Sequence, residues 1–320
     1  MKCLLRDLMA GALALLAVAA NAQSYPSKPI SFVVPFGPGS GSDLIARIIG
    51  QRLGVVLGQS VIIENKSGGN GAIAAVQVAR SVPDGYTILL GTNSPMSAAP
   101  SLNKAIGYDP IKDFVALCRI GSFTQMLLVN PDIPVKSMQE LVAYAKANPG
   151  KLSFASVSAS SVVAGETLKR AAGIDLLHVP YRSSPPAVQD ALSGRVSMVF
   201  TDMATGLQHH RSGALRGLAT TRLQRSALVP ELPTLDEAGV TGFDMDSWAG
   251  FFLPANTPRD IVTRLNTELR KIIDNPEVKA QIAATGFEAF SSSPDELDAF
   301  NKAQLVKWTK MIKDAGIQPE

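Results

Sequence analysis

Hydrophobic positions in this chain follow two periods that alternate along the sequence. Short apolar runs such as Phe32, Val33 and Val34 have the length of a buried strand. A loop rich in glycine or serine comes next, and then a segment such as 44–53, in which apolar residues recur every three or four positions. The repeated order of strand, loop and helix predicts an α/β protein with mostly parallel sheets and helices on both faces of each sheet.

The same pattern assigns the individual elements. Capping boxes at 137–140 and 293–296 mark the starts of two helices. Strands are expected at 32–34, 61–64, 86–90, 126–129, 152–155, 176–179, 196–200, 215–219 and 248–253. Helices are expected at 44–53, 72–80, 138–147, 162–172, 187–192, 206–211, 260–273, 277–284 and 294–315.

Two domains are expected, although no low-complexity linker or repeat divides the chain. The all-helical tail after residue 258 can return to cover the sheet built by the N-terminal third. We therefore expect a discontinuous first domain (23–123 and 250–320) and a second domain (124–249). The chain would cross between them near 122–126 and 246–250.

Composition excludes some classes of function. The chain has 320 residues, 46% of them hydrophobic and only 6% aromatic, so its core is aliphatic. Its 30 basic and 27 acidic residues give a formal charge of +3 and are scattered along the sequence. This balance argues against a nucleic-acid partner.

The first 22 residues have the pattern of a signal peptide. Lys2 and Arg6 precede an apolar run at 8–20, and an A-x-A site ends at Ala22. We expect cleavage after Ala22 and export to the periplasm; the alternative is an uncleaved anchor. Cys118 is then the sole cysteine of the mature chain, and its apolar surroundings favour a buried, inert thiol.

The stretch 35–43 is the first candidate for binding. Glycines let the backbone approach a ligand, and the start of the following helix leaves N–H groups without intrahelical partners. A dinucleotide fingerprint would need glycine at Ser42, and a phosphate loop would need a lysine nearby. A small anion is the better interpretation; the alternative is a loop that only turns tightly.

Residues 153–166 repeat this arrangement. A strand leads through a serine-rich loop into a helix, and two such loops facing each other could hold a small carboxylate. Asp202 ends another strand, at the edge where ligands bind in open α/β sheets, and could accept a hydrogen bond from a ligand amine or hydroxyl. The alternative is that the serines and Asp202 only cap helices.

No catalytic or metal-binding pattern is present. A Gly-x-Ser-x-Gly motif is out of phase, and His178, His209 and His210 lack metal-ligand spacing. Asp244 and Asp246 read as a solvated turn, and no serine has an evident basic partner. We expect no enzyme activity, no metal and no cofactor.

Several short motifs, spread from Tyr25 to the C-terminus, carry a resemblance to a known family. They are Tyr25-Pro26-Ser27-Lys28-Pro29-Ile30, Val34-Pro35-Phe36, Pro83-Asp84-Gly85-Tyr86-Thr87, Tyr108-Asp109-Pro110, Ala147-Asn148-Pro149-Gly150-Lys151-Leu152, Ala164-Gly165-Glu166, His178-Val179-Pro180-Tyr181 and Pro233-Thr234-Leu235-Asp236-Glu237-Ala238-Gly239. The chain resembles the Bug (Bordetella uptake gene) family of periplasmic solute-binding proteins of tripartite tricarboxylate transport systems.

The resemblance implies a two-domain Venus-flytrap fold of the type II periplasmic-binding-protein class, each domain a mixed, mostly parallel sheet flanked by helices. It implies a monomer that holds a small carboxylate in the cleft and delivers it to a permease with one large and one small membrane subunit. A sensing protein that signals to a membrane receptor is one alternative, and an exported hydrolase is another.

Carried over by position, three segments would contact the ligand: 35–43, 155–161 and 201–205. This chain departs from the family at Gly39-Ser40, at the short serine-rich second loop, and at Arg182-Ser183. The hydroxyls of the second loop favour a hydroxylated or amide-bearing acid. The expected ligand-binding residues are Phe36, Gly37, Pro38, Gly39, Ser40, Gly41, Ser42, Asp43, Ser156, Val157, Ser158, Ala159, Ser160, Asp202 and Thr205.

Overall fold

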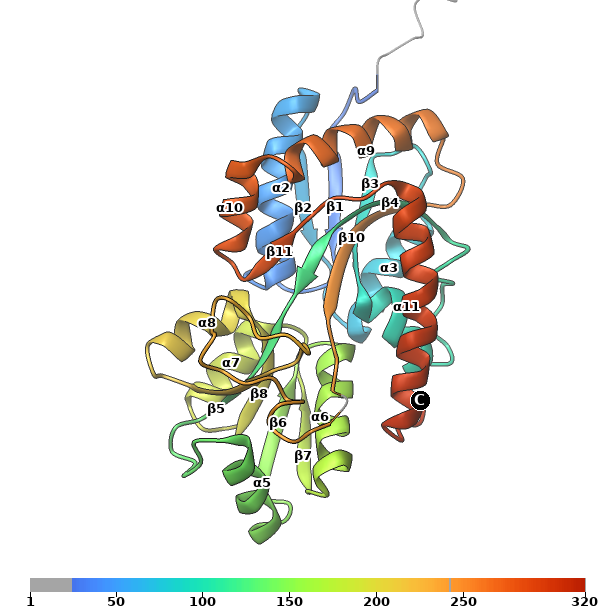
Figure 1. The fold of residues 1–320 in the computed structure, drawn as a ribbon. Helices are drawn as coiled ribbons and strands as arrows, with labels where there is room; N and C mark the ends of the chain where they lie inside the picture. Colours follow the sequence, from blue (N-terminus) through green and yellow to red (C-terminus); the bar gives the residue numbers. More distant parts are fainter. Residues whose placement is uncertain (1–24, 242, 320) are drawn as a thin grey trace, which may run out of the picture.

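The computed structural model describes residues 25–241 and 243–319, and it places two β-sheets in two lobes, one above the other in Figure 1. The expected signal peptide and its cleavage site lie outside the described residues. The two mixed sheets with flanking helices confirm the predicted α/β fold.

The first lobe contains a six-stranded sheet with the order β11-β4-β10-β3-β1-β2. β1 pairs in parallel with β2 and β3, whereas β10 is antiparallel to both β3 and β4. Four strands therefore run in one direction, and β10 and β11 run in the other. The strands are β1 (Ile30–Val34), β2 (Val61–Asn65), β3 (Thr87–Thr92), β4 (Phe114–Phe123), β10 (Ser247–Pro254) and β11 (Phe287–Ala289).

The second lobe contains a five-stranded sheet with the order β7-β6-β8-β5-β9. β6 pairs in parallel with β7 and β8, and β5 is antiparallel to β8 and β9. The strands are β5 (Gln125–Val129), β6 (Leu152–Ser156), β7 (Leu176–Pro180), β8 (Met198–Asp202) and β9 (Arg216–Thr220).

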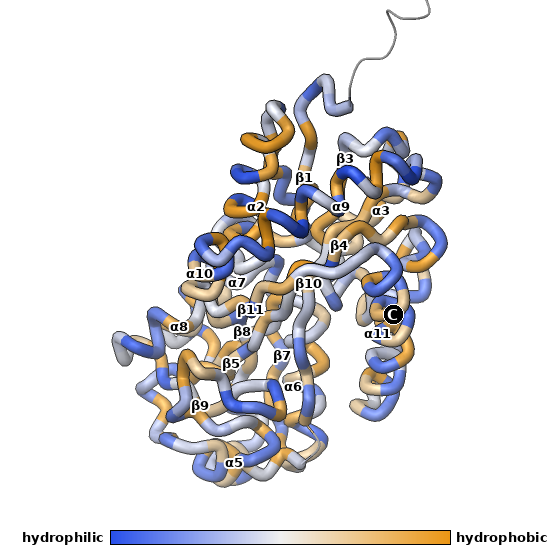
Figure 2. The backbone as a smooth tube through the Cα atoms, turned by 45° about the horizontal axis from the view of Figure 1, so that its top comes forward, coloured by the Kyte–Doolittle hydropathy of each residue, from blue (hydrophilic) through white to orange (hydrophobic). Residues whose placement is uncertain are grey.

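Helices cover both faces of the first sheet. Apolar side chains of α2, α9 and α10 form one cluster with the sheet, and those of α3 and the start of α11 form another. Figure 2 shows hydrophobic and hydrophilic turns alternating along α9, as expected for a helix with one buried face. The elements are α2 (Gly41–Leu57), α3 (Ala72–Ala79), α9 (Arg259–Ile273), α10 (Pro276–Ala283) and α11 (Pro294–Asp314), with short helical segments η1 (Gly69–Gly71), η2 (Ser94–Ala98) and α4 (Ala99–Leu102).

The second sheet is covered in the same way, and the C-terminal helix contributes to its core. α7 and α8 pack on one face, and α5 and α6 on the other. Trp308 and Ile312 of α11 are buried in the cluster of the second lobe, so this helix contacts both lobes instead of covering the first sheet alone. The helices are α5 (Met138–Ala147), α6 (Ala159–Ala172), α7 (Ser184–Leu192) and α8 (Met203–Arg211).

The chain passes between the sheets at two places. β4 ends at Phe123 and β5 begins at Gln125, so Thr124 alone separates strands of different sheets. The return passage leads into β10, where the Met245 N–H still donates to the Thr221 carbonyl of the second lobe.

Several boundaries differ from the sequence expectation because capping residues lie earlier than the apolar pattern indicates. α6 begins at Ala159, not 162, because Ser158 caps it; α8 begins at Met203 because Asp202 caps it. The sequence pattern did not assign β4, β11 or the segment of η2 and α4.

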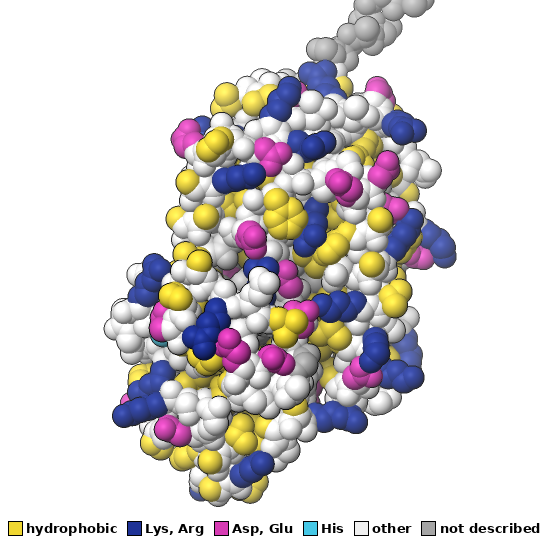
Figure 3. All heavy atoms as spheres, in the orientation of Figure 1, with side chains coloured by type: hydrophobic (Ala, Val, Ile, Leu, Met, Phe, Trp, Pro, Cys, Tyr) yellow, Lys and Arg dark blue, Asp and Glu magenta, His cyan; other side chains and the backbone are white. Residues whose placement is uncertain are grey.

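The surface shown in Figure 3 carries basic and acidic side chains interspersed over both lobes. Within residues 25–241 and 243–319, none of the helices has the length and apolar character needed to cross a membrane.

Candidate functional site

A cavity lies where the two lobes meet, and residues of both lobes line it. Interfaces between domains are preferred positions for small-molecule sites. Its wall combines the ends of strands with the starts of helices from both sheets. The residues that line it are Phe36, Ser40, Ser42, Thr92, Asn93, Ser94, Phe123, Gln125, Val157, Ser158, Ser160, Ser184, Asp202 and Ser247.

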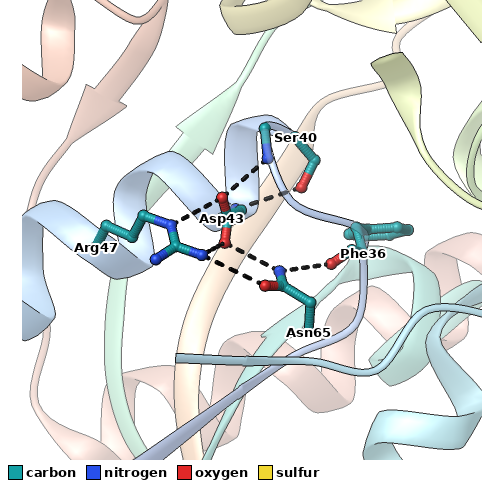
Figure 4. Close-up of polar contacts among 6 residues, drawn as sticks. Phe36, Ser40, Asp43, Arg47 and Asn65 are labelled. Carbon is teal, nitrogen blue, oxygen red and sulfur yellow. Dashed lines mark hydrogen bonds and ion pairs between the residues drawn. The ribbon is translucent and has the colours of Figure 1, made fainter. Parts of the chain in front are cut away.

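The loop between β1 and α2 is organised by Asp43 (Figure 4). The Asp43 carboxylate accepts hydrogen bonds from the Gly39 N–H at 2.9 Å, from Arg47 Nε at 3.0 Å and from Asn65 Nδ2 at 2.9 Å. Burial raises the pKa of Asp43, but the hydrogen bonds from Arg47, Gly39 and Asn65 outweigh it, so the pKa lies below 3.8. Both carboxylate oxygens of Asp43 are occupied by these hydrogen bonds, so the side chain holds the shape of the loop. Asp43 is not among the residues that line the cavity.

Asn65 makes a second contact that holds the β1–α2 loop. Its Nδ2 also donates to the Phe36 carbonyl at 2.9 Å, which ties the turn to β2. Ser40 caps α2 by accepting from the Asp43 N–H. The N–H groups of Gly41 and Ser42, in the first turn of α2, then have no intrahelical acceptor.

The loop between β6 and α6 is held by its own hydroxyls. Ser161 Oγ accepts from the N–H groups of Val157 and Ser158 at 2.8 and 2.9 Å, within a capping box formed with Ser158. These two amides are therefore not free for a ligand, whereas those of Ala159 and Ser160 have no intrahelical acceptor. The first turns of α2 and α6, on opposite sides of the cavity, thus each contain two backbone amides without an intrahelical acceptor.

Asp202 lies at the end of β8 and is the one charged side chain on the wall, as far as residues 25–241 and 243–319 show. Its Oδ1 accepts from the N–H and the hydroxyl of Thr205 at 2.9 and 3.1 Å, which caps α8. Its Oδ2 accepts from Ser184 Oγ at 3.0 Å. Among the described residues, neither lysine nor arginine lines the cavity.

Two donors on the cavity wall are buried without a partner. Asn93 is 2% exposed and Thr92 is 3% exposed, and neither Asn93 Nδ2 nor Thr92 Oγ1 has a hydrogen-bond partner within the described part of the protein. Leaving such a group unpaired costs about 1–3 kcal/mol. Thr92 ends β3, the strand beside β1, and Asn93 follows it. A bound molecule that pairs with these two groups would recover this cost.

The two lobes meet at glycines. A Cβ on Gly37 would lie 2.9 Å from Ser183 Oγ, and one on Gly41 would lie 3.0 Å from Asp202 Oδ1. Gly37 and Gly41 belong to the first lobe, and Ser183 and Asp202 to the second. The first loop therefore fits against the second lobe with no space for side chains at these two positions.

The residues expected from the sequence fall into two groups. Seven of them line the cavity: Phe36, Ser40, Ser42, Val157, Ser158, Ser160 and Asp202. Eight lie in the same segments but outside the wall: Gly37, Pro38, Gly39, Gly41, Asp43, Ser156, Ala159 and Thr205. The sequence analysis did not name the other seven lining residues: Thr92, Asn93, Ser94, Phe123, Gln125, Ser184 and Ser247.

One expectation about side-chain pairs was wrong. Ser156 Oγ lies 2.6 Å from His178 Nε2, so a serine does have a basic partner. The His178 ring stacks on Phe154, and burial lowers the pKa of His178. Because Ser156 is 2% exposed and off the cavity wall, the pair fastens β6 to β7.

Comparison with known proteins places this geometry in context. The family described as "Tripartite tricarboxylate transporter family receptor" matches residues 45–317. The protein BugT of Bordetella pertussis is 32% identical over 304 residues, which cover 94% of this chain and 93% of BugT.

Two solved structures are similar over nearly the whole chain. Rpa4515 of R. palustris, solved with adipate, has a TM-score of 0.90 at 32% identity and covers 93% of this chain and 100% of its own. MatC of Rhodopseudomonas palustris, solved with malate, has a TM-score of 0.85 at 28% identity and covers 90% of this chain and 100% of its own.

Proposed function

This chain belongs to the tripartite tricarboxylate transporter receptor family, and on that premise we propose that it captures a small organic carboxylate in the cavity between its lobes. It then delivers the acid to a membrane permease with one large and one small subunit. Adipate and malate in Rpa4515 and MatC support a carboxylate as the class of ligand. The signal-peptide pattern of the sequence at 1–22 supports export to the periplasm, and we propose cleavage after Ala22.

The observation that carries this proposal is the composition of the cavity wall. Ser42 and Ser160, in the first turns of α2 and α6, line the wall, and their amides lack an intrahelical acceptor. Asn93 Nδ2 is a buried donor without a partner among residues 25–241 and 243–319. A carboxylate is an acceptor for several donors at once, and its bonds to them are charge-assisted. Helix N-termini add partial positive charge, so the acid needs no lysine or arginine.

The proposed site comprises the fourteen residues that line the cavity. The eight expected residues outside the wall, Asp43 and Ser156 among them, belong to the same segments and would hold these loops in place. We also propose that 124–249 form the moving lobe and that 23–123 with 250–320 form the other lobe. Closure by rotation about the two crossing segments would shut the cavity over the ligand.

A binding role without catalysis fits the position of Ser156. The serine–histidine pair with the geometry of a nucleophile and base lies off the cavity wall, and Ser156 is buried. Substrate in the cavity would therefore not reach the Ser156 hydroxyl.

Isothermal titration of the purified mature chain against a panel of mono-, di- and hydroxycarboxylates tests the proposal. At least one acid should bind with one-to-one stoichiometry and raise the melting temperature. Mass spectrometry of ligand released from the purified protein provides an independent check. If no carboxylate binds or co-purifies, the proposed function is wrong.

A further inference from the structure

The charge on the cavity wall has the wrong sign for a site that recognises acid groups alone. Asp202 lines the cavity, and none of the lining residues within the described ranges is a lysine or arginine that would neutralise it. A carboxylate placed beside Asp202 would be repelled, and the low dielectric of a closed cavity strengthens this repulsion. The ligand must therefore present something other than an acid group to Asp202.

The contacts of Asp202 define what that group is. Oδ1 already accepts two hydrogen bonds from Thr205, whereas Oδ2 accepts one from within the described residues, that of Ser184 Oγ. A carboxylate oxygen accepts about two hydrogen bonds. Asp202 Oδ2 therefore has capacity for one further donor.

The rest of the wall has the opposite preference. Asn93 Nδ2 is a buried donor that has no partner in the described part of the chain, and the amides of Ser42 and Ser160, which lack an intrahelical acceptor, are donors as well. An acid group fits among these donors. The wall thus combines a set of donors for a carboxylate with one anionic acceptor, Asp202.

We propose that the ligand is a carboxylic acid that also carries a hydrogen-bond donor, which binds Asp202 Oδ2. The donor is a hydroxyl, amide or ammonium group close enough to the carboxylate for both to fit in the cavity. This inference rests on the proposed function and specifies the substrate class of the same site. An acid without such a donor would lie beside the Asp202 carboxylate and donate no hydrogen bond to Oδ2.

Matched acids that differ by one hydroxyl test the inference directly. We expect malate to bind the wild-type protein at least about tenfold more tightly than succinate, and lactate more tightly than propionate, because a site built to bond a hydroxyl rejects the analogue without it. Alanine in place of lactate distinguishes an ammonium from a hydroxyl donor. Each dissociation constant is measured by calorimetry.

The variant Asp202→Asn links any preference to this side chain. Asparagine caps a helix as well as aspartate does, so α8 keeps its cap, but the acceptor at Oδ2 becomes a donor. The preference for malate over succinate should fall below about threefold or reverse. Asp190→Asn is the matched control, because Asp190 accepts from Tyr181 in the same lobe but lies outside the cavity wall. It should keep the wild-type preference.

The outcomes separate the two proposals. Equal or tighter binding of succinate and propionate by the wild type overturns the inference on the donor and leaves the proposed function standing. An unchanged malate preference in a folded Asp202→Asn variant also overturns it. If no acid of either kind binds, the proposed function itself is wrong. The wild-type comparison does not depend on whether the variant folds.

Discussion

A methyl group on Gly37 would lie 2.9 Å from Ser183 Oγ and 3.2 Å from Ser183 Cβ. Gly37 belongs to the β1–α2 loop of one lobe, and Ser183 precedes α7 in the other. The absence of a side chain at Gly37 therefore permits this close contact between the lobes. Ser183 makes no side-chain cap to α7, so its hydroxyl can be removed without loss of a helix cap.

Gly37→Val should weaken ligand binding about tenfold or more, because the larger side chain holds the lobes apart. Calorimetry with the tightest-binding acid measures the effect. The fold of the first lobe should be unaffected, since the clash is with the opposite lobe. Adding Ser183→Gly should restore part of the affinity lost in Gly37→Val. A double variant that binds no better than Gly37→Val alone would contradict the contact between Gly37 and Ser183.

Asn93→Ala should lower the affinity about tenfold to a hundredfold, the effect of losing a hydrogen bond to a charged group. The free protein should be little destabilised by the loss of this amide, because Asn93 Nδ2 has no partner in the described protein. Thr220→Val is the matched control, since Thr220 Oγ1 is also buried and unpartnered but does not line the cavity. Equal losses of affinity in the two variants would show that Asn93 does not contact the ligand.

Asp43→Ala should lower the free energy of unfolding by about 1.5–3 kcal/mol, because three hydrogen bonds to a buried carboxylate are lost. It should also weaken binding, because the loop loses its fixed shape. Chemical denaturation and calorimetry measure the two effects. Asp298→Ala, which breaks an exposed pair with Lys302, should cost less than about 0.5 kcal/mol.

The pH dependence of Asp43 has a definite sign. Its pKa is lowered in the folded protein, so its stabilisation is present above pH 3.8 and is lost as the pH falls through the lowered pKa. The wild type should therefore lose more stability than Asp43→Asn on acidification below about pH 4. If the free energies of unfolding of the two proteins fall equally with pH below about pH 4, the lowered pKa of Asp43 is contradicted.

The pKa of Asp246 is shifted in the opposite direction, so its contribution to stability depends on pH with the opposite sign. Burial, opposed by Arg222 and Arg119, raises its pKa to about 6. The folded state then binds a proton more readily than the unfolded state between about pH 4 and pH 6, so this group favours folding less as the pH rises through that range. The stability of the wild type minus that of Asp246→Asn should fall from pH 4 to pH 6 and be constant above about pH 7. A difference that rises or stays flat would refute the shift.

The sequence predicted the fold class and both loops because each depends on local order. A short stretch of sequence is enough to recognise a strand, a loop of glycines or serines, and the start of a helix, as at Ser40 and Ser158. Thr92 and Asn93 could have been found by the same rule, since they lie at the end of β3, at the edge where β1 also ends. The sequence analysis ended the expected strand at residue 90 and did not consider them as ligand contacts.

The remaining wall residues depend on tertiary structure. Ser184 starts a helix whose first turn contains prolines, and the apolar pattern placed that start three residues later. Phe123, Gln125 and Ser247 line the cavity because the lobes meet there, which no local period encodes. The contact of Ser156 with His178 follows from the register of β6 with β7, a pairing across 22 positions.

The central claim is that backbone amides and uncharged side chains hold an acid group with no lysine or arginine beside it. A crystal structure with the tightest-binding acid from the panel tests this most directly. We expect carboxylate oxygens within about 3.2 Å of the N–H groups of Gly41 and Ser42 or of Ala159 and Ser160, and no basic side chain within about 4 Å. A carboxylate paired with an arginine or lysine, or bound outside the cavity between the lobes, would contradict the account.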